Sequence, residues 1–110
     1  METRKYDCPF SYAMDCISGK WKGQILWHLK TGTKRYGELR KLIPNITQKM
    51  LTQNLRELEN NKIILRKVYA VVPPKVEYSL SIHAKELIQI LENLHKWGIK
   101  TCDKLDILSE

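Results

Sequence analysis

The sequence lacks the features that identify exported, membrane-spanning and zinc-binding proteins. It holds three cysteines, Cys8, Cys16 and Cys102, and this odd number without an export signal argues against a disulfide-stapled fold. No two of them form a Cys-x-x-Cys pair, so no structural zinc site is expected. No run approaches the roughly 18 apolar residues of a membrane span, and the charged start METRKYDCPF is unlike a secretory signal. We therefore expect a cytoplasmic protein that does not enter a membrane.

The residue patterns that support catalysis are missing as well. There is no glycine-rich phosphate-binding loop and no serine at a nucleophile elbow. The histidines, His28, His83 and His95, have no aspartate or cysteine at a productive spacing. The sequence therefore predicts no enzyme, no cofactor and no metal site.

Acidic residues are scarce in the middle of the chain. Between Lys20 and Lys75 there are 13 lysines and arginines but only three acids, so the net charge of +7 belongs to this region. Such a region suits a polyanion, because neutralising phosphates releases condensed counterions. An acidic lipid surface and a merely solvated basic face remain as alternatives. With 110 residues, 43% of them hydrophobic, residues 1–110 are expected to form a single domain.

Apolar spacing predicts four short helices in the first 60 residues. They cover residues 10–19, 20–30, 36–43 and 46–60, and one short strand at residues 33–35 precedes the third. Gly19 ends the first helix in the left-handed conformation, Pro44 ends the third, and the Thr47 hydroxyl caps the fourth. The expected core positions are Trp21, Ile25, Leu26, Leu29, Leu39, Leu42 and Ile43. The third and fourth helices, separated by a Pro-Asn turn of about four residues, have the outline of a helix-turn-helix.

The helix at residues 46–60 has two unlike sides. Leu51, Leu55 and Leu58 form an inward stripe, and a ridge of polar and cationic residues centres roughly 150° away. The ridge consists of Lys49, Thr52, Gln53 and Arg56, with Gln48 at its start. A DNA major groove accepts a helix, and its base edges pair with amides, hydroxyls and cations. We therefore expect this ridge to read DNA; the alternative is an ordinary solvent-exposed face.

The rest of the sequence predicts a β-hairpin and a long helix. The runs IILRKVYAVV and KVEYSLS flank PPK, so Pro73 and Pro74 stiffen a tip that carries Lys75. The second run alternates apolar and polar residues, as a half-buried strand does. In HAKELIQILENLHKWGIK the apolar residues cover about half of the helix circumference, wider than the ~100° that one core takes. Part of that surface is expected to meet another chain, through Ile90, Leu91, Leu94 and Trp97.

Together these elements predict a mainly α fold with a small β-hairpin wing (α+β), namely a winged helix-turn-helix. Residues 8–81 form its core and wing, and residues 82–103 form a terminal dimerisation helix and tail. In this fold the second helix of the motif enters the major groove, and the wing reaches phosphates or the minor groove. The further expected DNA contacts are Lys34, Arg35, Arg66, Lys67, Pro74 and Lys75, with Lys20 and Arg40 as additional backbone contacts. A protein-interaction module that does not read DNA would explain the last helix but not the central charge and the polar ridge.

Three stretches resemble one known family. They are CPFSYAMDCISGKWKGQILWHL, KRYGELRKLIPNITQKMLTQNLRELE and PPKVEYSLS, and they look like the HxlR-type winged helix-turn-helix transcriptional regulators over residues 7–99. The resemblance implies a homodimer that binds double-stranded DNA at a palindromic operator. It places the DNA contacts at Gln48, Lys49, Thr52, Gln53, Arg56 and the wing tip.

Two positions depart from the pattern of that family. Ser18-Gly19 replaces the usual Gly-Gly, and Lys62 stands where the family often has glycine. The helix at residues 46–60, which is the recognition helix of this fold, must therefore end differently, and we expect Asn60 or Asn61 to adopt the left-handed conformation.

The same resemblance implies a role for cysteine in sensing oxidants or electrophiles. Some members of the family are similar in sensing oxidants or electrophiles through the cysteine at the position of Cys8, and Arg4 and Lys5 would favour its thiolate. Cys102 would then resolve oxidised Cys8 as an intersubunit disulfide, and Cys16 would be buried filler. Two alternatives to cysteine sensing stay open. In the first, all three cysteines serve only as small hydrophobic residues. In the second, a small apolar effector binds between the core and the last helix, near Trp21, Trp27 and Trp97.

Overall fold

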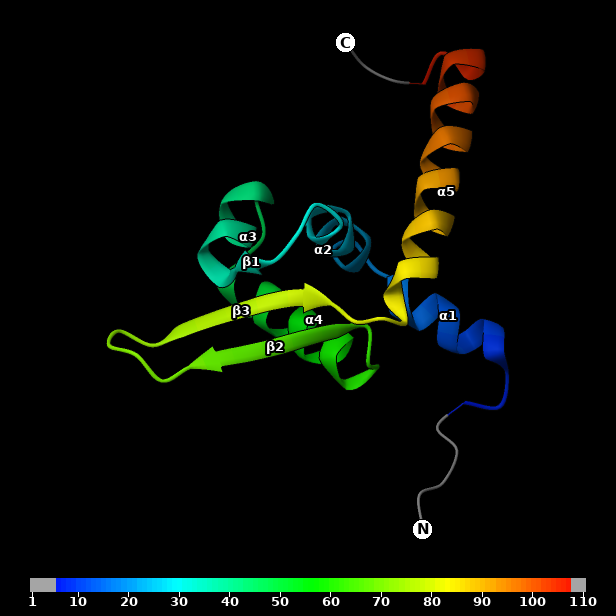
Figure 1. The fold of residues 1–110 in the computed structure, drawn as a ribbon. Coiled ribbons are helices and arrows are strands. Elements are labelled where there is room, and N and C mark those ends of the chain that lie inside the picture. The colour runs from blue at the N-terminus through cyan, green and yellow to red at the C-terminus, as the bar shows by residue number, and fades with distance from the viewer. Residues whose placement is uncertain (1–5, 108–110) are drawn as a thin grey trace.

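The computed structural model describes residues 6–107, and its elements form a winged helix-turn-helix (Figure 1). In chain order they are α1 (Pro9–Ile17), α2 (Lys22–Leu29), β1 (Lys34–Arg35), α3 (Tyr36–Leu42), α4 (Gln48–Asn60), β2 (Ile64–Tyr69), β3 (Lys75–Leu80) and α5 (Ala84–Leu105). The strands form an antiparallel sheet in the order β1-β3-β2. The predicted mainly helical fold with a hairpin wing is confirmed. Within the described residues no helix combines the length and apolarity that crossing a bilayer requires.

The core is built from the apolar stripes of α2, α3 and α4. Ile25, Leu26 and Leu29 of α2 are fully buried, as the spacing predicts. The prediction for Leu42 is wrong, because this side chain is 43% exposed. The prediction for Ile43, which directly follows α3, is confirmed, because this side chain is 1% exposed.

A short turn sets the angle between α3 and α4. Asn45 adopts a left-handed φ of 76°, and Ile46 is buried and anchors the turn in the core. The Thr47 hydroxyl accepts a hydrogen bond from the backbone N–H of Met50 at 3.1 Å, which confirms the predicted cap. The start of α4 is therefore capped by the residue that directly precedes it in the sequence.

The end of α4 differs from the prediction. Asn61 has a right-handed φ of −83°, and Lys62 itself is left-handed with φ 65°. The N–H of Lys62 donates to the Glu59 carbonyl and the N–H of Ile63 donates to the Leu58 carbonyl, both at 3.0 Å. This pair of bonds defines a Schellman motif. Its geometry demands the left-handed residue at position 62 even though that residue is a lysine.

The wing and the last helix extend from this core in different directions. The β2–β3 register runs from Ile64 opposite Leu80 to Tyr69 opposite Lys75. Helix α5 buries only Ala84, Ile88 and Leu91, and its later turns extend away from the other elements (Figure 1).

Candidate nucleic-acid interface

The exposed side of α4 carries the predicted polar ridge. Gln48, Lys49, Gln53 and Arg56 are exposed and Thr52 is half-buried, while the three leucines on the opposite side are at most 2% exposed. Together with Glu57 these ridge residues line a shallow cavity of about 680 Å³. Within the described part of the chain, the side chains of Gln48, Lys49, Gln53 and Arg56 form no hydrogen bond or ion pair. Their donors and acceptors are free to bind an external partner.

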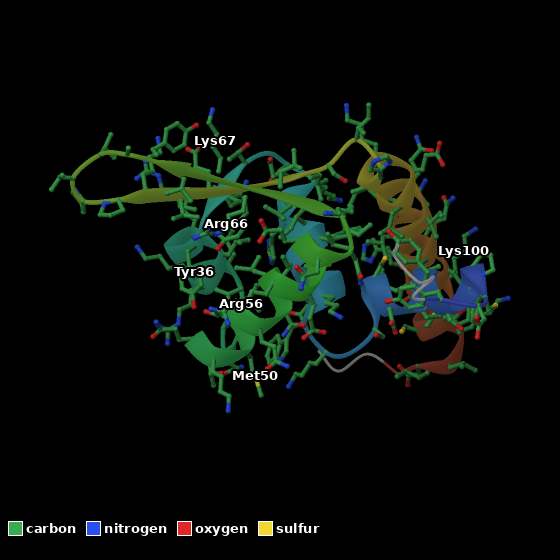
Figure 2. The ribbon with its side chains drawn as sticks, turned by 90° about the horizontal axis from the view of Figure 1, so that it is seen from below. Tyr36, Met50, Arg56, Arg66, Lys67 and Lys100 are labelled. Carbon is green, nitrogen blue, oxygen red and sulfur yellow. The ribbon has the colours of Figure 1, made fainter. Side chains whose placement is uncertain are left out.

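A second groove lies between this ridge and the wing. It has a volume of about 300 Å³ and is lined by Thr52, Leu55, Arg56, Glu59, Arg66 and Tyr78. Figure 2 shows Arg66 on the side of the wing that faces α4, with Arg56 across the gap. Two guanidinium groups on opposite walls form planar, bidentate donors that suit phosphate oxygens.

Lys67 does not join this groove. Successive residues of a strand point to opposite faces, so Lys67 lies on the far side of the wing from Arg66 (Figure 2). Its ammonium lies 4.9 Å from the ring centroid of Tyr69. Arg66 and Lys67, both predicted as DNA contacts, therefore lie on opposite faces of the wing, and of the two only Arg66 faces α4.

Lys75 is held on the same outer face by neighbouring side chains. Its ammonium is 3.3 Å from a Glu77 carboxylate oxygen and 4.8 Å from the Tyr69 ring centroid. The Tyr69 hydroxyl donates to Glu77 at 2.9 Å. That hydrogen bond, with the charges of Lys75 and Arg35, lowers the pKa of Glu77. The positive charge of Lys75 is therefore partly compensated within the wing itself.

Lys34 and Arg35, the two residues before α3, lie in different surroundings. The ammonium of Lys34 donates to the Thr31 hydroxyl at 3.1 Å and to the Gly32 carbonyl at 3.4 Å, so it is engaged by its own loop. Arg35 is exposed. It lines a cavity of about 460 Å³ together with Pro74 and Lys75 at the wing tip. The structure thus brings three of the predicted contacts together at the tip.

One ion pair beneath the ridge is not evident from the sequence analysis. Lys22 of α2 is 7% exposed, and its ammonium donates to Glu57 of α4 at 2.9 Å and to the backbone carbonyl of Asp15 at 3.1 Å. A signal for its burial was present, since Lys22 shares the helical stripe of Ile25, Leu26 and Leu29. This ammonium joins the end of α1, the start of α2 and the recognition helix.

The cysteines lie in three different environments. Cys8 is exposed at the start of α1, where the backbone N–H groups of Ser11 and then Phe10 stabilise the thiolate and lower its pKa. Cys16 is buried, as predicted, and burial raises its pKa. Cys102 is half-buried in the last turns of α5, which lie far from the start of α1 (Figure 1). Arg4 and Lys5 lie outside the described residues.

The expected effector site contains only one of the three tryptophans. A cavity of about 430 Å³ lies between α2 and α5 and is lined by Gly23, Gln24, Trp27, His28, Leu91, Leu94 and His95. The ring centroids of Trp27 and His95 are 4.9 Å apart. Trp21 is buried and Trp97 is 63% exposed, and neither lines this cavity. Among the described residues no group of three or more His, Cys, Asp or Glu side chains is placed to hold a metal ion.

Comparison with known proteins agrees with this geometry. A model of the HxlR-like helix-turn-helix family matches residues 16–106. The HTH-type transcriptional regulator YtcD of Bacillus subtilis (strain 168) is 54% identical over 98 residues, which are 89% of this chain and 78% of YtcD. The redox regulator HypR is similar in its reduced form, with a TM-score of 0.85 and 44% identity over 92% of this chain and 100% of that one. Its oxidised form has a TM-score of 0.78 and 47% identity over 84% and 96% of the two chains. The chain therefore belongs to the HxlR-like helix-turn-helix family and is a transcriptional regulator, not an enzyme.

Proposed function

We propose that this regulator acts as a homodimer on a palindromic operator, with one α4 helix in each of two major grooves. The observation that carries the proposal is the ridge of Gln48, Lys49, Gln53 and Arg56, which is exposed and free of hydrogen bonds to its own chain. Amides and cations on one helix face match the donors and acceptors of base edges. In a two-fold dimer of this fold the two helices lie about 34 Å apart, one turn of the duplex.

The dimer is supported by an apolar strip that the chain does not cover. Ile90, Leu94 and Trp97 of α5 are 59%, 53% and 63% exposed. Leu91, predicted with them, is only 7% exposed and packs into its own core, so it falls outside the strip. The strip lies on the part of α5 that extends beyond the core, where an isolated helix would have little support. A second copy of the chain would bury this strip against its own.

Oxidant sensing through Cys8 is the finer part of the proposal. An exposed cysteine with a lowered pKa has the thiolate fraction that reacts with oxidants. Two thiols, of Cys8 and of Cys102 in the partner copy, would lose two electrons and two protons to an oxidant such as diamide, forming one disulfide while the N=N bond of diamide is reduced to the hydrazine. HypR, a redox regulator similar in both its reduced and oxidised forms, supports this direction. The alternative is an effector in the cavity between α2 and α5, with no cysteine chemistry.

The test of DNA reading is a binding titration against DNA fragments of the source genome that have been selected by their binding to the protein. A DNA reader loses affinity linearly with the logarithm of salt concentration, whereas a protein-interaction module binds no fragment at any salt. Gln53→Ala and Arg56→Ala should reduce the preference for the selected fragments over random DNA. Lys100→Ala serves as the matched control, because Lys100 lies on α5 away from this face (Figure 2). If Arg56→Ala retains the wild-type preference, the ridge is not the reading surface.

The test of the redox part uses the same fragments. Diamide treatment of the wild type should produce a disulfide-linked dimer on non-reducing gels and change operator affinity. Cys8→Ser and Cys102→Ser should each abolish the linked dimer. An unchanged affinity and no linked species after diamide would exclude cysteine sensing while leaving DNA reading intact.

A further inference from the structure

The hydroxyl of Tyr36 lies beneath the first turns of the recognition helix. Tyr36 begins α3, and its oxygen is 3.0 Å from the backbone carbonyl oxygen of Gln48 and 3.0 Å from the hydroxyl oxygen of Thr52. Figure 2 shows Tyr36 next to α4, on the same face of the molecule as Arg56. A side chain of the first motif helix therefore contacts a hydroxyl of the proposed reading ridge.

The hydrogens in this group can be assigned from the number of donors. A carbonyl oxygen has no hydrogen to donate, so the short contact between Tyr36 and Gln48 is favourable only if the phenol donates its single hydrogen to that carbonyl. With that hydrogen used, the contact between Tyr36 and Thr52 must take its hydrogen from Thr52. The reverse arrangement, with the phenol donating to Thr52, would bring two bare oxygens of Tyr36 and Gln48 to 3.0 Å without a hydrogen between them.

Thr52 remains accessible from outside in this arrangement. Its side chain is half-buried and lines both the ridge cavity and the groove beside Arg66. A threonine hydroxyl carries one hydrogen and two acceptor lone pairs. With the hydrogen directed at Tyr36, an external partner meets only acceptor capacity.

We infer that Tyr36 sets the polarity of Thr52 as a reader, so that Thr52 accepts a hydrogen bond from an amino group on a base. In the major groove adenine N6 and cytosine N4 are donors, whereas guanine O6 and thymine O4 are acceptors. The position facing Thr52 should therefore be adenine or cytosine on the contacted strand, and a keto base there should be rejected. This inference rests on the proposed DNA reading by α4. It makes Tyr36 a positioning residue that specifies the operator without touching it.

The experiment measures binding to the selected operator and to every single-base-pair variant of one half-site. Thr52→Val keeps the shape of the side chain and removes the hydroxyl, so the base pair at which it loses discrimination is the one that Thr52 reads. In the wild type, replacing the amino base there by a keto base should lower affinity roughly five- to tenfold. In Tyr36→Phe the Thr52 hydrogen is released to turn outward, so the same replacement should change affinity by less than about twofold. Thr52→Ser should behave like the wild type.

The outcomes separate this inference from the proposed function. If the wild type shows no sequence preference on any DNA, DNA reading by α4 fails. If it shows a preference but Tyr36→Phe keeps the full amino-to-keto penalty, the inference is wrong and the proposed function stands. Every base pair carries one such amino group in the major groove, so it can be removed at the position found with Thr52→Val by placing purine for adenine or 2-pyrimidinone for cytosine. An unchanged wild-type affinity for that DNA would also overturn the inference, and this result does not depend on Tyr36→Phe folding. The combined variant Tyr36→Phe/Thr52→Val should match Thr52→Val alone at this position.

Discussion

The ion pair between Lys22 and Glu57 offers the sharpest test of how the recognition helix is held. The two charges differ in burial, since the Lys22 side chain is 9% exposed and the Glu57 side chain is 45% exposed. Removing one partner leaves the other charge behind, and the cost depends on how well water can reach it. The two single substitutions should therefore have unequal effects on stability.

The magnitudes follow from what each substitution leaves. Lys22→Met leaves a carboxylate that can turn to solvent, and the methionine fills the buried space, so the expected loss is about 1 kcal/mol. Glu57→Ala leaves a buried ammonium with only the Asp15 carbonyl, 3.1 Å away, and the expected loss is about 2–3 kcal/mol. The double variant Lys22→Met/Glu57→Ala leaves neither charge unpaired. Its expected loss is smaller than that of Glu57→Ala alone.

The assay is urea unfolding at one fixed protein concentration, because the stability of the proposed dimer would depend on that concentration. Lys41→Met, on the exposed side of α3, is the matched control and should change the free energy of unfolding by less than about 0.5 kcal/mol. If Lys22→Met costs as much as Glu57→Ala, the reasoning from unequal burial is refuted. The pair also bears on DNA binding, since Glu57 is the acidic residue lining the ridge cavity. Lys22→Met removes the cation that pairs with the Glu57 carboxylate. Because the unpaired carboxylate would repel phosphate groups, this variant should bind DNA roughly fivefold more weakly at low salt.

Three further predictions concern other parts of the molecule. Lys62→Gly should raise the free energy of unfolding by about 0.5–1 kcal/mol in urea titrations, because glycine relieves the left-handed strain at φ 65°; Asn61→Gly, at φ −83°, should lower it. Trp97→Glu should shift the proposed homodimer to the monomer in analytical ultracentrifugation, whereas Ile82→Glu, at a side chain that is also exposed but lies off the strip, should leave the proposed dimer intact. Cys8 should reach half of its maximal iodoacetamide reactivity at a lower pH than free glutathione, since its lowered pKa means that the thiolate is already present there. Mass spectrometry of the alkylated peptides should show Cys16, whose pKa is raised by burial, reacting last.

The recognition helix could be predicted from the sequence because its information is local. The leucine spacing of α4 and the polar residues between the leucines determine which side is buried, whatever packs against it. The cap at Thr47 and the hairpin around Pro73 and Pro74 are local in the same sense. The structure confirms the cap and the hairpin.

The wrong or missing predictions depend on contacts with residues that are distant in sequence, or on where the buried core ends along a helix. Lys22 finds its carboxylate 35 positions away, and no pattern within α2 indicates that partner. For Leu91, half a helix circumference of apolar residues could not show where the protomer's own core ends and the uncovered strip begins.

Most of the α4 residues that hold the helix in place differ from those proposed to contact DNA. The helix is held from below by Leu51, Leu55 and Leu58, and from its neighbours by hydrogen bonds of Tyr36 at its start and Tyr12 at its end, the latter donating to the Asn61 carbonyl at 2.8 Å. Among the ridge side chains Thr52 takes part in these contacts through its hydroxyl, which lies 3.0 Å from that of Tyr36, whereas Gln48, Lys49, Gln53 and Arg56 contribute to none of them. Operator preference can therefore change through the ridge with little effect on stability. Tyr12 belongs to α1, the helix that begins directly after Cys8. A displacement of α1 would therefore strain the hydrogen bond between Tyr12 and the end of α4.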